Sequence, residues 1–305
     1  MDYPHPELNV PILFSVTGHR DIPKELHESL NKHLEGYFKM FSDAYSNTRI
    51  VLMSALADGG DRIVAKAAIN AGIDVMAVLP MPQDVYERTF YENVGSVEEF
   101  RDLLSKCRSG VHVLPSEIDP ERINEEEQYR ELGKFFVMHS HVLIALWDGK
   151  PPKMDGGTAD VVAMARFGVD WGSGSKCGHG MCDDHLDMVD NRLVYCIKTP
   201  RKEAPAGWKL ESRFILPIEI PGDIGPVPNI EEQKEDISEE LPKAYHSTFE
   251  RINAMNLDAL LKNNQRKTRR REGDRRIMAE GVREDLEAKD TFYLLRVLKA
   301  IRPMR

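Results

Sequence analysis

The sequence predicts an α/β fold in which a Rossmann-like, doubly wound and mostly parallel sheet is followed by a C-terminal helical extension. Strand-like and helical segments alternate through the first two-thirds of the chain, which is typical of βαβ units with right-handed crossovers. Several strand-like runs are continuously apolar, as strands are when helices cover both faces of a parallel sheet. Three turns that contain glycine directly follow such strands, where an open α/β sheet binds its ligands.

The predicted elements follow from these patterns in chain order. The predicted strands are short apolar runs: Ile12–Thr17, Ile50–Ser54, Val75–Leu79, Val111–Leu114, Val142–Trp147 and Leu193–Ile197. The predicted helices lie between or after them: Lys24–Phe41, Gly60–Asn70, Val97–Cys107, Pro120–Met138 and Thr158–Phe167. This order is the one expected of a doubly wound sheet.

Composition and charge restrict the class of protein. The 305-residue chain is 41% hydrophobic and 30% charged, which fits a globular protein with an ordinary core. Its formal net charge of −9 argues against a surface built as a whole for nucleic acid or anionic membranes. Four cysteines and the absence of an N-terminal leader pattern lead us to expect a cytoplasmic protein with reduced thiols. No apolar run approaches the ~20 residues of a membrane span, so we expect the chain as given to be soluble.

Two polar stretches divide the chain. The glycine-rich stretch Asp170–Asn191 interrupts the pattern of strands and helices and is interpreted as an insertion. The proline-rich stretch Ile220–Asn229 is typical of a linker, and beyond it the sequence is charged and helical without a strand signal. The sequence therefore predicts a sheet domain over residues 1–222, with the insertion at 170–191, and a charged helical region over residues 223–305.

Three glycine-bearing turns are candidate ligand-binding segments, because each comes just after a predicted strand. They are Gly18–Arg20, Ala57–Arg62 and Gly156–Asp160. Glycine lets the backbone approach a ligand closely, and the amides at a helix start can donate to an anion. Taken singly, each is more typical of a plain turn before a helix. Together they can gather at the carboxyl edge of one parallel sheet, where such folds hold nucleotides.

The charged side chains in these turns suit a nucleotide. Arg20 and Arg62 offer planar donors to a phosphate group. Asp61 and Asp160 can accept hydrogen bonds from ribose hydroxyls, and the alternative role of each is a negative charge that stabilises a helix start. The ligand that we infer from these side chains is nucleotide-like.

Two aromatic residues can present a flat face to a base. They are Tyr86 and Trp147, and the alternative interpretation of Trp147 is a core residue at a strand end. The full set of candidate ligand-binding residues is Gly18, His19, Arg20, Ala57, Gly59, Gly60, Asp61, Arg62, Tyr86, Trp147, Gly156, Gly157, Thr158 and Asp160. We expect no catalytic residue among them, and no bound metal or cofactor.

Four sequence blocks in this order resemble the SLOG superfamily, and within it the sensor branch associated with TIR and SMODS proteins of bacterial defence systems. The blocks are SVTGHRDIP, LMSALADGGDRIVAKAA, VMAVLPMPQDVYERTF and HVLIALWDGKPPKMDGGTADVV, which together span Ile12 to Val162. The resemblance implies a Rossmann-like fold that binds nucleotides or signals derived from NAD. It also implies that the three glycine-bearing turns form the ligand pocket, with His19 and Arg20 facing an anionic ligand.

A more distant branch, the LOG phosphoribohydrolases, cleaves the N-glycosidic bond of nucleoside monophosphates around a Pro-Gly-Gly-x-Gly-Thr-x-x-Glu motif. The matching segment here is MDGGTADVV. If Thr158 is aligned with the threonine of the motif, Val161 takes the place of the acid and Asp160 lies one residue early. On a helix this offset turns the carboxylate by ~100°. The resemblance therefore favours binding over cleavage.

A cluster of potential zinc ligands lies in the predicted insertion. Cys177, His179, Cys182 and His185 are close in sequence, and zinc can bind Cys and His together. Their spacing matches none of the usual paired spacings of zinc fingers, and one short loop would supply all four ligands. We interpret the segment as an insertion or a lid over the ligand site, and zinc is the alternative.

The segment Arg266–Arg276 is strongly basic in an otherwise acidic chain. Such a segment can contact nucleic-acid phosphates or an anionic membrane surface. The simpler interpretation is a solvated helix face whose charge is balanced by the acidic run Glu231–Glu240. No aromatic residue is interleaved with the basic residues, so we expect no specific binding of nucleic acid.

These patterns and the resemblance predict a sensor that binds a nucleotide-derived second messenger, either cyclic or derived from NAD, and relays occupancy to an effector in antiviral defence. The alternative is a nucleotide N-glycosidase. Near the C-terminus Leu286, Tyr293, Val297 and Ile301 recur at near-helical spacing, and such an apolar stripe needs a partner surface. We expect a second protomer to supply that surface, which predicts a homo-oligomer. The resemblance suggests a membrane or effector segment beyond Arg305 as the alternative.

Overall fold

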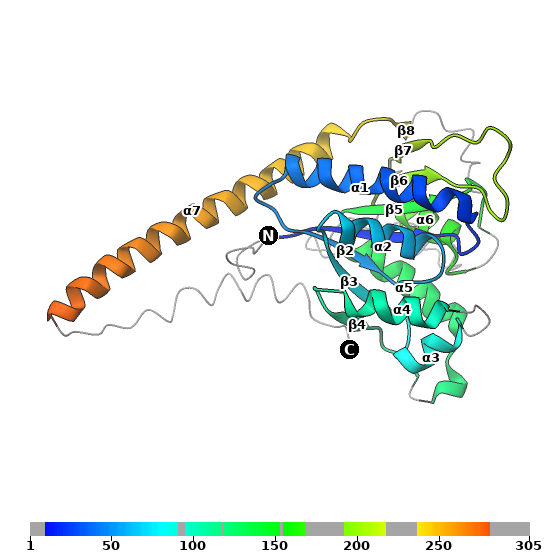
Figure 1. The fold of residues 1–305 in the computed structure, drawn as a ribbon, viewed down its shortest axis with the longest axis horizontal. Coiled ribbons are helices and arrows are strands. Elements are labelled where there is room, and N and C mark those ends of the chain that lie inside the picture. Colours follow the sequence, from blue (N-terminus) through cyan, green and yellow to red (C-terminus); the bar gives the residue numbers. More distant parts are fainter. Residues whose placement is uncertain are drawn as a thin grey trace. The chain divides into compact units, whose positions relative to one another are not determined.

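An eight-stranded sheet with the strand order β4-β3-β2-β1-β5-β6-β7-β8 forms the centre of the protein, seen here in a computed structural model (Figure 1). The structure describes residues 10–90, 95–117, 119–152, 155–168, 192–217 and 237–280. The strands are β1 (Ile12–Gly18), β2 (Ile50–Ser54), β3 (Asp74–Leu79), β4 (Val111–Val113), β5 (Val142–Trp147), β6 (Leu193–Lys198), β7 (Ser212–Ile215) and β8 (Ile237–Ser238).

Strands β1 to β6 are parallel, and β7 and β8 continue the sheet in antiparallel pairing. The central strand is β1, where Phe14 lies opposite Leu52 of β2 and Val142 of β5. Every residue of β2 and of β5 is buried, as their continuous apolar runs predict for strands covered on both faces. The predicted mostly parallel α/β sheet is confirmed.

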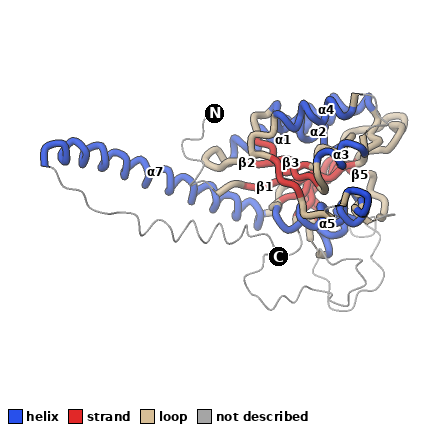
Figure 2. The backbone as a smooth tube through the Cα atoms, turned by 90° about the horizontal axis from the view of Figure 1, so that it is seen from below, coloured by secondary structure: helices blue, strands red, loops and turns tan. Residues whose placement is uncertain are grey.

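The helices cover both faces of this sheet. They are η2 (Lys24–Leu26), α1 (His27–Ala44), α2 (Gly60–Asn70), α3 (Gln83–Arg88), α4 (Ser96–Ser105), η3 (Pro120–Arg122), α5 (Glu125–His139), α6 (Thr158–Phe167) and α7 (Lys243–Glu280). Helices α1, α2 and α4 lie on one face, and α5 lies on the other, as Figure 2 shows. The buried side chains follow this division, because those of α1, α2 and α4 belong to one core cluster and those of α5 and α6 to two others. The sheet is therefore doubly wound, as predicted.

Several predicted elements have the bounds that the structure shows, namely β2, β5, α2 and α6. The prediction that no strand follows the linker is wrong, because β8 pairs with β7 and extends the sheet. The sequence prediction also omitted β7 and α3, whose four and six residues are too short for a clear periodicity. The predicted insertion Asp170–Asn191 and the predicted linker Ile220–Asn229 lie outside the described residues, as does the predicted C-terminal apolar stripe.

The chain divides into two compact units, Met1–Leu257 and Asp258–Arg305. Helix α7 begins in the first unit, where the buried Phe249 packs against Phe41 and Tyr45 with ring centroids 5.4 and 5.7 Å apart. In the second unit the structure describes residues 258–280, which are helical and include the basic segment Arg266–Arg276. Among the described helices, none is long and apolar enough to cross a membrane.

Candidate functional site

The order of the strands creates a topological switch point between β1 and β5. From β1 the chain moves outward through β2, β3 and β4, and it then returns to place β5 on the other side of β1. The connection after β1 leads to α1 on one face, whereas the connection after β5 leads to α6 on the other. Loops that diverge in this way leave the crevice in which open α/β sheets bind ligands. The candidate turn Gly18–Arg20 lies at this point of the sheet.

Close backbone packing explains the glycines of the first two candidate turns. A Cβ atom built on Gly18 would lie 2.7 Å from the Cα of Gly60, and a Cβ on Gly60 would lie equally close to the Cα of Gly18. Gly59 has a φ of +82°, and a Cβ there would lie 2.3 Å from the carbonyl oxygen of His19. The amide of Gly60 donates to the same oxygen at 2.9 Å. These glycines join the end of β1 to the start of α2, and their predicted contact with a ligand stays a prediction.

His19 connects the two loops that diverge at the switch point. Its Nε2 lies 3.1 Å from Oδ1 of Asp148 and 3.2 Å from the backbone amide nitrogen of Asp148, the first residue after β5. Burial lowers the pKa of His19, and the opposing effect of Asp148 does not compensate. The imidazole is therefore neutral at pH 7 and adds no positive charge at the switch point.

Arg20 brings a positive charge to the surface of the crevice. Its side chain is exposed, and Nη2 donates to the hydroxyl of Tyr129 on α5 at 3.0 Å. The Cζ atom of Arg20 lies 5.5 Å from the centre of the Tyr129 ring. Within the described part of the chain, Tyr129 is its single hydrogen-bond partner. Most of the guanidinium donors are therefore available to an anion.

Asp61 is a buried carboxyl group beside this arginine. Its residue is 5% exposed, and burial raises its pKa to about 7. The charges of Arg20 and Arg62 and hydrogen bonds from the backbone of Ala57 and Gly18 act in the opposite direction. A carboxyl group with a pKa near 7 next to a crevice is a candidate functional group, because strongly shifted pKa values are common at functional sites.

The hydroxyl of Tyr86 completes a group of four polar side chains. It is buried and has no hydrogen-bond partner among the described residues, although Tyr129 and Asp61 both raise the pKa of Tyr86 in addition to its burial. The rings of Tyr86 and Tyr129 lie with centroids 6.4 Å apart. We call Arg20, Asp61, Tyr86 and Tyr129 the Arg20 cluster. A buried hydroxyl without a partner is costly and is a natural place for a ligand or a bound water to donate or accept.

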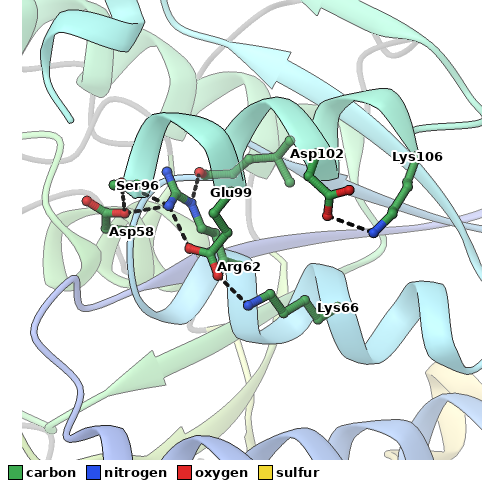
Figure 3. A network of polar contacts seen from close by, with 8 residues as sticks. Asp58, Arg62, Lys66, Ser96, Glu99, Asp102 and Lys106 are labelled. Carbon is green, nitrogen blue, oxygen red and sulfur yellow. Dashed lines mark hydrogen bonds and ion pairs between the residues drawn. The ribbon is translucent and has the colours of Figure 1, made fainter. Parts of the chain in front are cut away.

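Arg62, in contrast, is engaged by the protein itself (Figure 3). Its guanidinium donates to the carbonyl oxygen of Leu56 and to Ser96, both at 2.9 Å. It also pairs with Asp58 at 2.7 Å and with Glu99 of α4 at 2.8 Å. These contacts attach the turn after β2 to α4. Its predicted contact with a phosphate stays a prediction.

The third candidate turn has a similar internal network. Oδ2 of Asp160 accepts from the amide of Gly156 at 2.8 Å and from Arg130 of α5 at 3.3 Å. Gly157 caps α6 and Thr158 is its first residue. Burial raises the pKa of Asp160, whereas the Gly156 amide and Arg130 oppose the rise. These contacts attach Asp160 to the turn before α6 and to α5, and its predicted hydrogen bond to a ribose hydroxyl stays a prediction.

The two aromatic candidates are both buried. Trp147 is 1% exposed, and its Nε1 donates to the carbonyl oxygen of Lys150 at 3.0 Å. Tyr86 is 0% exposed and packs edge-on against Phe90 and Phe100. Neither ring offers a face to solvent in this structure, and their stacking on a base stays a prediction.

The predicted zinc ligands Cys177, His179, Cys182 and His185 lie outside the described residues. Within the described residues no group of His, Cys, Asp or Glu side chains is arranged to hold a metal ion. Sequence reasoning missed Tyr129 and Asp148, which contact Arg20 and His19. No local motif marks Tyr129, because it reaches the crevice only through the packing of α5. Asp148 follows a predicted strand directly, and that position was a usable signal.

The fold is that of a Rossmann-like α/β protein, and Arg20 is an exposed cation at its topological switch point. No protein-family model and no curated protein matches the sequence. Among solved structures, the chain is similar to DNA processing protein A (DprA) from Streptococcus pneumoniae, with 21% identity over 46% of this chain and 42% of that chain. The TM-score of this match is 0.29, too low to support an argument about function.

Proposed function

We propose that this protein is a receptor that binds a nucleotide-derived signalling ligand at the switch point between β1 and β5, with Arg20 as its anion-binding residue. The proposal rests on one observation, the exposed Arg20 guanidinium at the switch point, which makes a single hydrogen bond, to Tyr129, within the described residues. A planar guanidinium held by one edge can still form two parallel hydrogen bonds with a phosphate. The position agrees with the general location of ligands in doubly wound sheets.

The remainder of the Arg20 cluster supports an anionic ligand. Because the pKa of Asp61 is about 7, this carboxyl group is substantially protonated at neutral pH and does not fully offset the charge of Arg20. The buried hydroxyl of Tyr86 provides a further polar group without a partner in the described structure. These groups favour a ligand that combines an anion with hydroxyls, which is the chemistry of a nucleotide.

The finer identity of the ligand follows the resemblance of the four sequence blocks to the SLOG sensor branch. On that basis we propose a cyclic nucleotide or a cyclic ADP-ribose isomer as ligand, and a relay to an effector in bacterial antiviral defence. We further propose that the protein acts in the cytoplasm as a homo-oligomer. The C-terminal helices would change their arrangement on binding only if the ligand has different affinities for the two arrangements.

Titration calorimetry tests the ligand site. The probes are cyclic AMP, cyclic GMP, cyclic dinucleotides and cyclic ADP-ribose isomers. Arg20→Ala should weaken binding about 10- to 100-fold, because it removes charge-assisted hydrogen bonds of ~1.5–3 kcal/mol. Lys24→Ala is the matched control, since Lys24 is an exposed cation four residues later. Equal affinities of the wild type and Arg20→Ala for every bound probe would overturn the assignment.

A second candidate function is hydrolysis of an N-glycosidic bond, and the raised pKa of Asp61 favours it. A group that titrates near pH 7 can act as a general acid or base. Asp160 is less suited, because the Gly156 amide and Arg130 hold its carboxylate. Incubation with nucleoside monophosphates or NAD, followed by chromatography for the free base, separates the two functions. Release over many turnovers that is lost in Asp61→Asn would establish the enzyme and replace the receptor.

A further inference from the structure

The loop after β6 is attached to the loop after β1. The amide of Lys202 donates to the carbonyl oxygen of Asp21 at 2.7 Å, and Nε of Arg201 donates to Oδ1 of Asp21 at 2.8 Å. Since β5 lies between β1 and β6 in the sheet, these bonds span the carboxyl end of β5. The loop that begins after Lys198 is therefore joined to the turn at the switch point.

Arg201 places a second guanidinium at this crevice. Its side chain is 48% exposed, and within the described residues Asp21 is its single hydrogen-bonding partner, through Nε. The charge of Arg201 also acts on His19, whose pKa it lowers, and Asp148 in turn raises the pKa of Arg201. Arg201 thus belongs to the same electrostatic environment as the His19–Asp148 contact.

The two arginines belong to different loops, which follow β1 and β6. Arg20 extends towards Tyr129 on α5, whereas Arg201 comes from the loop after β6. His19 precedes Arg20 in the turn, and the charge of Arg201 lowers the pKa of His19. In both arginines the protein uses one nitrogen, and the remaining donors are available in the described structure.

The bond between Arg201 and Asp21 is of a kind that a ligand can replace. Both side chains are partly exposed, at 48% and 29%, and exposed ion pairs contribute little to stability. Lys202 has a φ of +63°, a left-handed conformation that costs free energy in a residue other than glycine. The loop is therefore held in a strained conformation by contacts that are individually weak.

We propose that Arg201 is a second anion-binding residue of the switch-point site, that Asp21 occupies it until ligand binds, and that the site consequently prefers ligands with two phosphoryl groups. One phosphoryl group pairs with Arg20, and the second replaces the Asp21 carboxylate on Arg201. The preferred class is a nucleoside diphosphate or a dinucleotide, and a nucleoside monophosphate binds more weakly. This inference rests on the proposed function, because it assumes that Arg20 binds an anionic nucleotide.

Calorimetry with paired probes tests the inference. The probes are the 5′-mono- and 5′-diphosphates of adenosine, guanosine, cytidine and uridine, titrated into the full chain. The wild type should bind a diphosphate more tightly than the matching monophosphate. Arg201→Gln should weaken the diphosphate about 10- to 100-fold and leave the monophosphate unchanged, because only the second phosphoryl group loses its partner. Asp21→Asn should strengthen diphosphate binding, because it removes the competing carboxylate.

Further variants distinguish a failure of this inference from a failure of the proposed binding of a nucleotide by Arg20. Lys209→Gln removes an exposed cation from the same connection between β6 and β7 and should not change the preference. A wild type that binds none of these probes and none of the cyclic nucleotides overturns both the proposed function and this inference. A wild type that binds a cyclic nucleotide but no linear mono- or diphosphate overturns this inference alone. If Arg20→Ala abolishes binding but Arg201→Gln affects mono- and diphosphates alike, only this inference is overturned. An unchanged diphosphate affinity in Asp21→Asn also overturns it, and a gain in affinity is a result that misfolding cannot imitate.

Discussion

The turn after β1 and the turn after β2 each carry an arginine, and the two side chains have opposite surroundings. Arg20 is exposed and donates to one tyrosine hydroxyl in the described structure. Arg62 is 3% exposed at its side chain and is bonded to Asp58, Ser96 and Glu99 as well as to a backbone carbonyl. The first arginine can recognise a ligand, whereas the second holds two elements of the fold together.

The difference arises from what covers each turn. Arg62 is the third residue of α2, and helical side chains lean towards the N-terminus of their helix, so its guanidinium reaches back over the turn that precedes α2. There α4 supplies Ser96 and Glu99. Arg20 precedes η2, and in the described structure its guanidinium makes one hydrogen bond, to the Tyr129 hydroxyl, with Cζ 5.5 Å from the centre of the Tyr129 ring. An arginine after a strand is thus a ligand-binding candidate only where no neighbouring helix satisfies it.

The largest loss of stability from a substitution is expected when Arg62 is removed. Arg62→Ala leaves Asp58 and Glu99 without their buried cation, and breaking a buried pair in this way typically costs ~3–5 kcal/mol. We expect the lower end of this range, because the Glu99 side chain is 40% exposed. Urea unfolding measures the change, with Lys66→Ala as the control, since Lys66 is an exposed partner of the same glutamate. If both variants lose the same stability, Arg62 does not hold the turn.

Both arginines lower the pKa of Asp61, and the titration of this carboxyl group should make the free energy of unfolding depend on pH between about pH 4 and pH 7. Burial raises its pKa from 3.8 to about 7, so the folded protein binds a proton that the unfolded chain has released. The protonated Asp61 contributes its full stabilisation below about pH 4. This stabilisation falls as the pH rises to about 7 and is lost above that pH. The loss is at most ~4 kcal/mol, at 1.36 kcal/mol per pKa unit.

The measurement compares unfolding free energies of the wild type and Asp61→Asn from pH 4 to pH 8. The difference between the two unfolding free energies should fall from pH 4 to about pH 7, because the other titrating groups contribute equally to both proteins and cancel. Since Arg20 lowers the pKa of Asp61, Arg20→Ala should move the range to higher pH. A difference that is independent of pH would mean that Asp61 is ionised throughout.

The backbone contact between the turns after β1 and β2 predicts a smaller loss of stability, in Gly60→Ala. In Gly60→Ala the new Cβ would lie 2.7 Å from the Cα of Gly18, and overpacking of this kind costs ~1–3 kcal/mol. Gly36→Ala is the matched control, because its Cβ meets nothing within 4 Å in α1 and should stabilise the helix by ~0.5–1 kcal/mol. Thermal unfolding of the two variants should give shifts of opposite sign. A rise of the melting temperature in Gly60→Ala as well would show that the two turns can move apart to accommodate the new Cβ atom.

Much of the fold was predictable from local patterns, but the site was predictable only in part. The bounds of β2, β5, α2 and α6 follow from apolar runs and from glycines at helix starts. The difference between Arg20 and Arg62 does not follow from local patterns, because the partners of both side chains come from elements far away in the sequence. Tyr129 is 109 positions from Arg20, and Arg201 is 180 positions from Asp21. Such contacts depend on how helices and loops pack, which a turn motif does not encode.

The smallest effect on stability is expected at Arg20 itself. Arg20→Ala removes one exposed hydrogen bond, to Tyr129, and substitutions at such surface positions usually change stability by less than ~0.5 kcal/mol. Tyr129→Phe removes the hydroxyl that accepts this hydrogen bond. The double variant should therefore lose no more stability than either single variant. Urea unfolding of the three variants measures these values. A loss of ~2 kcal/mol or more in Arg20→Ala would place Arg20 in the same structural role as Arg62, and the crevice would then lack the available cation on which anion recognition depends.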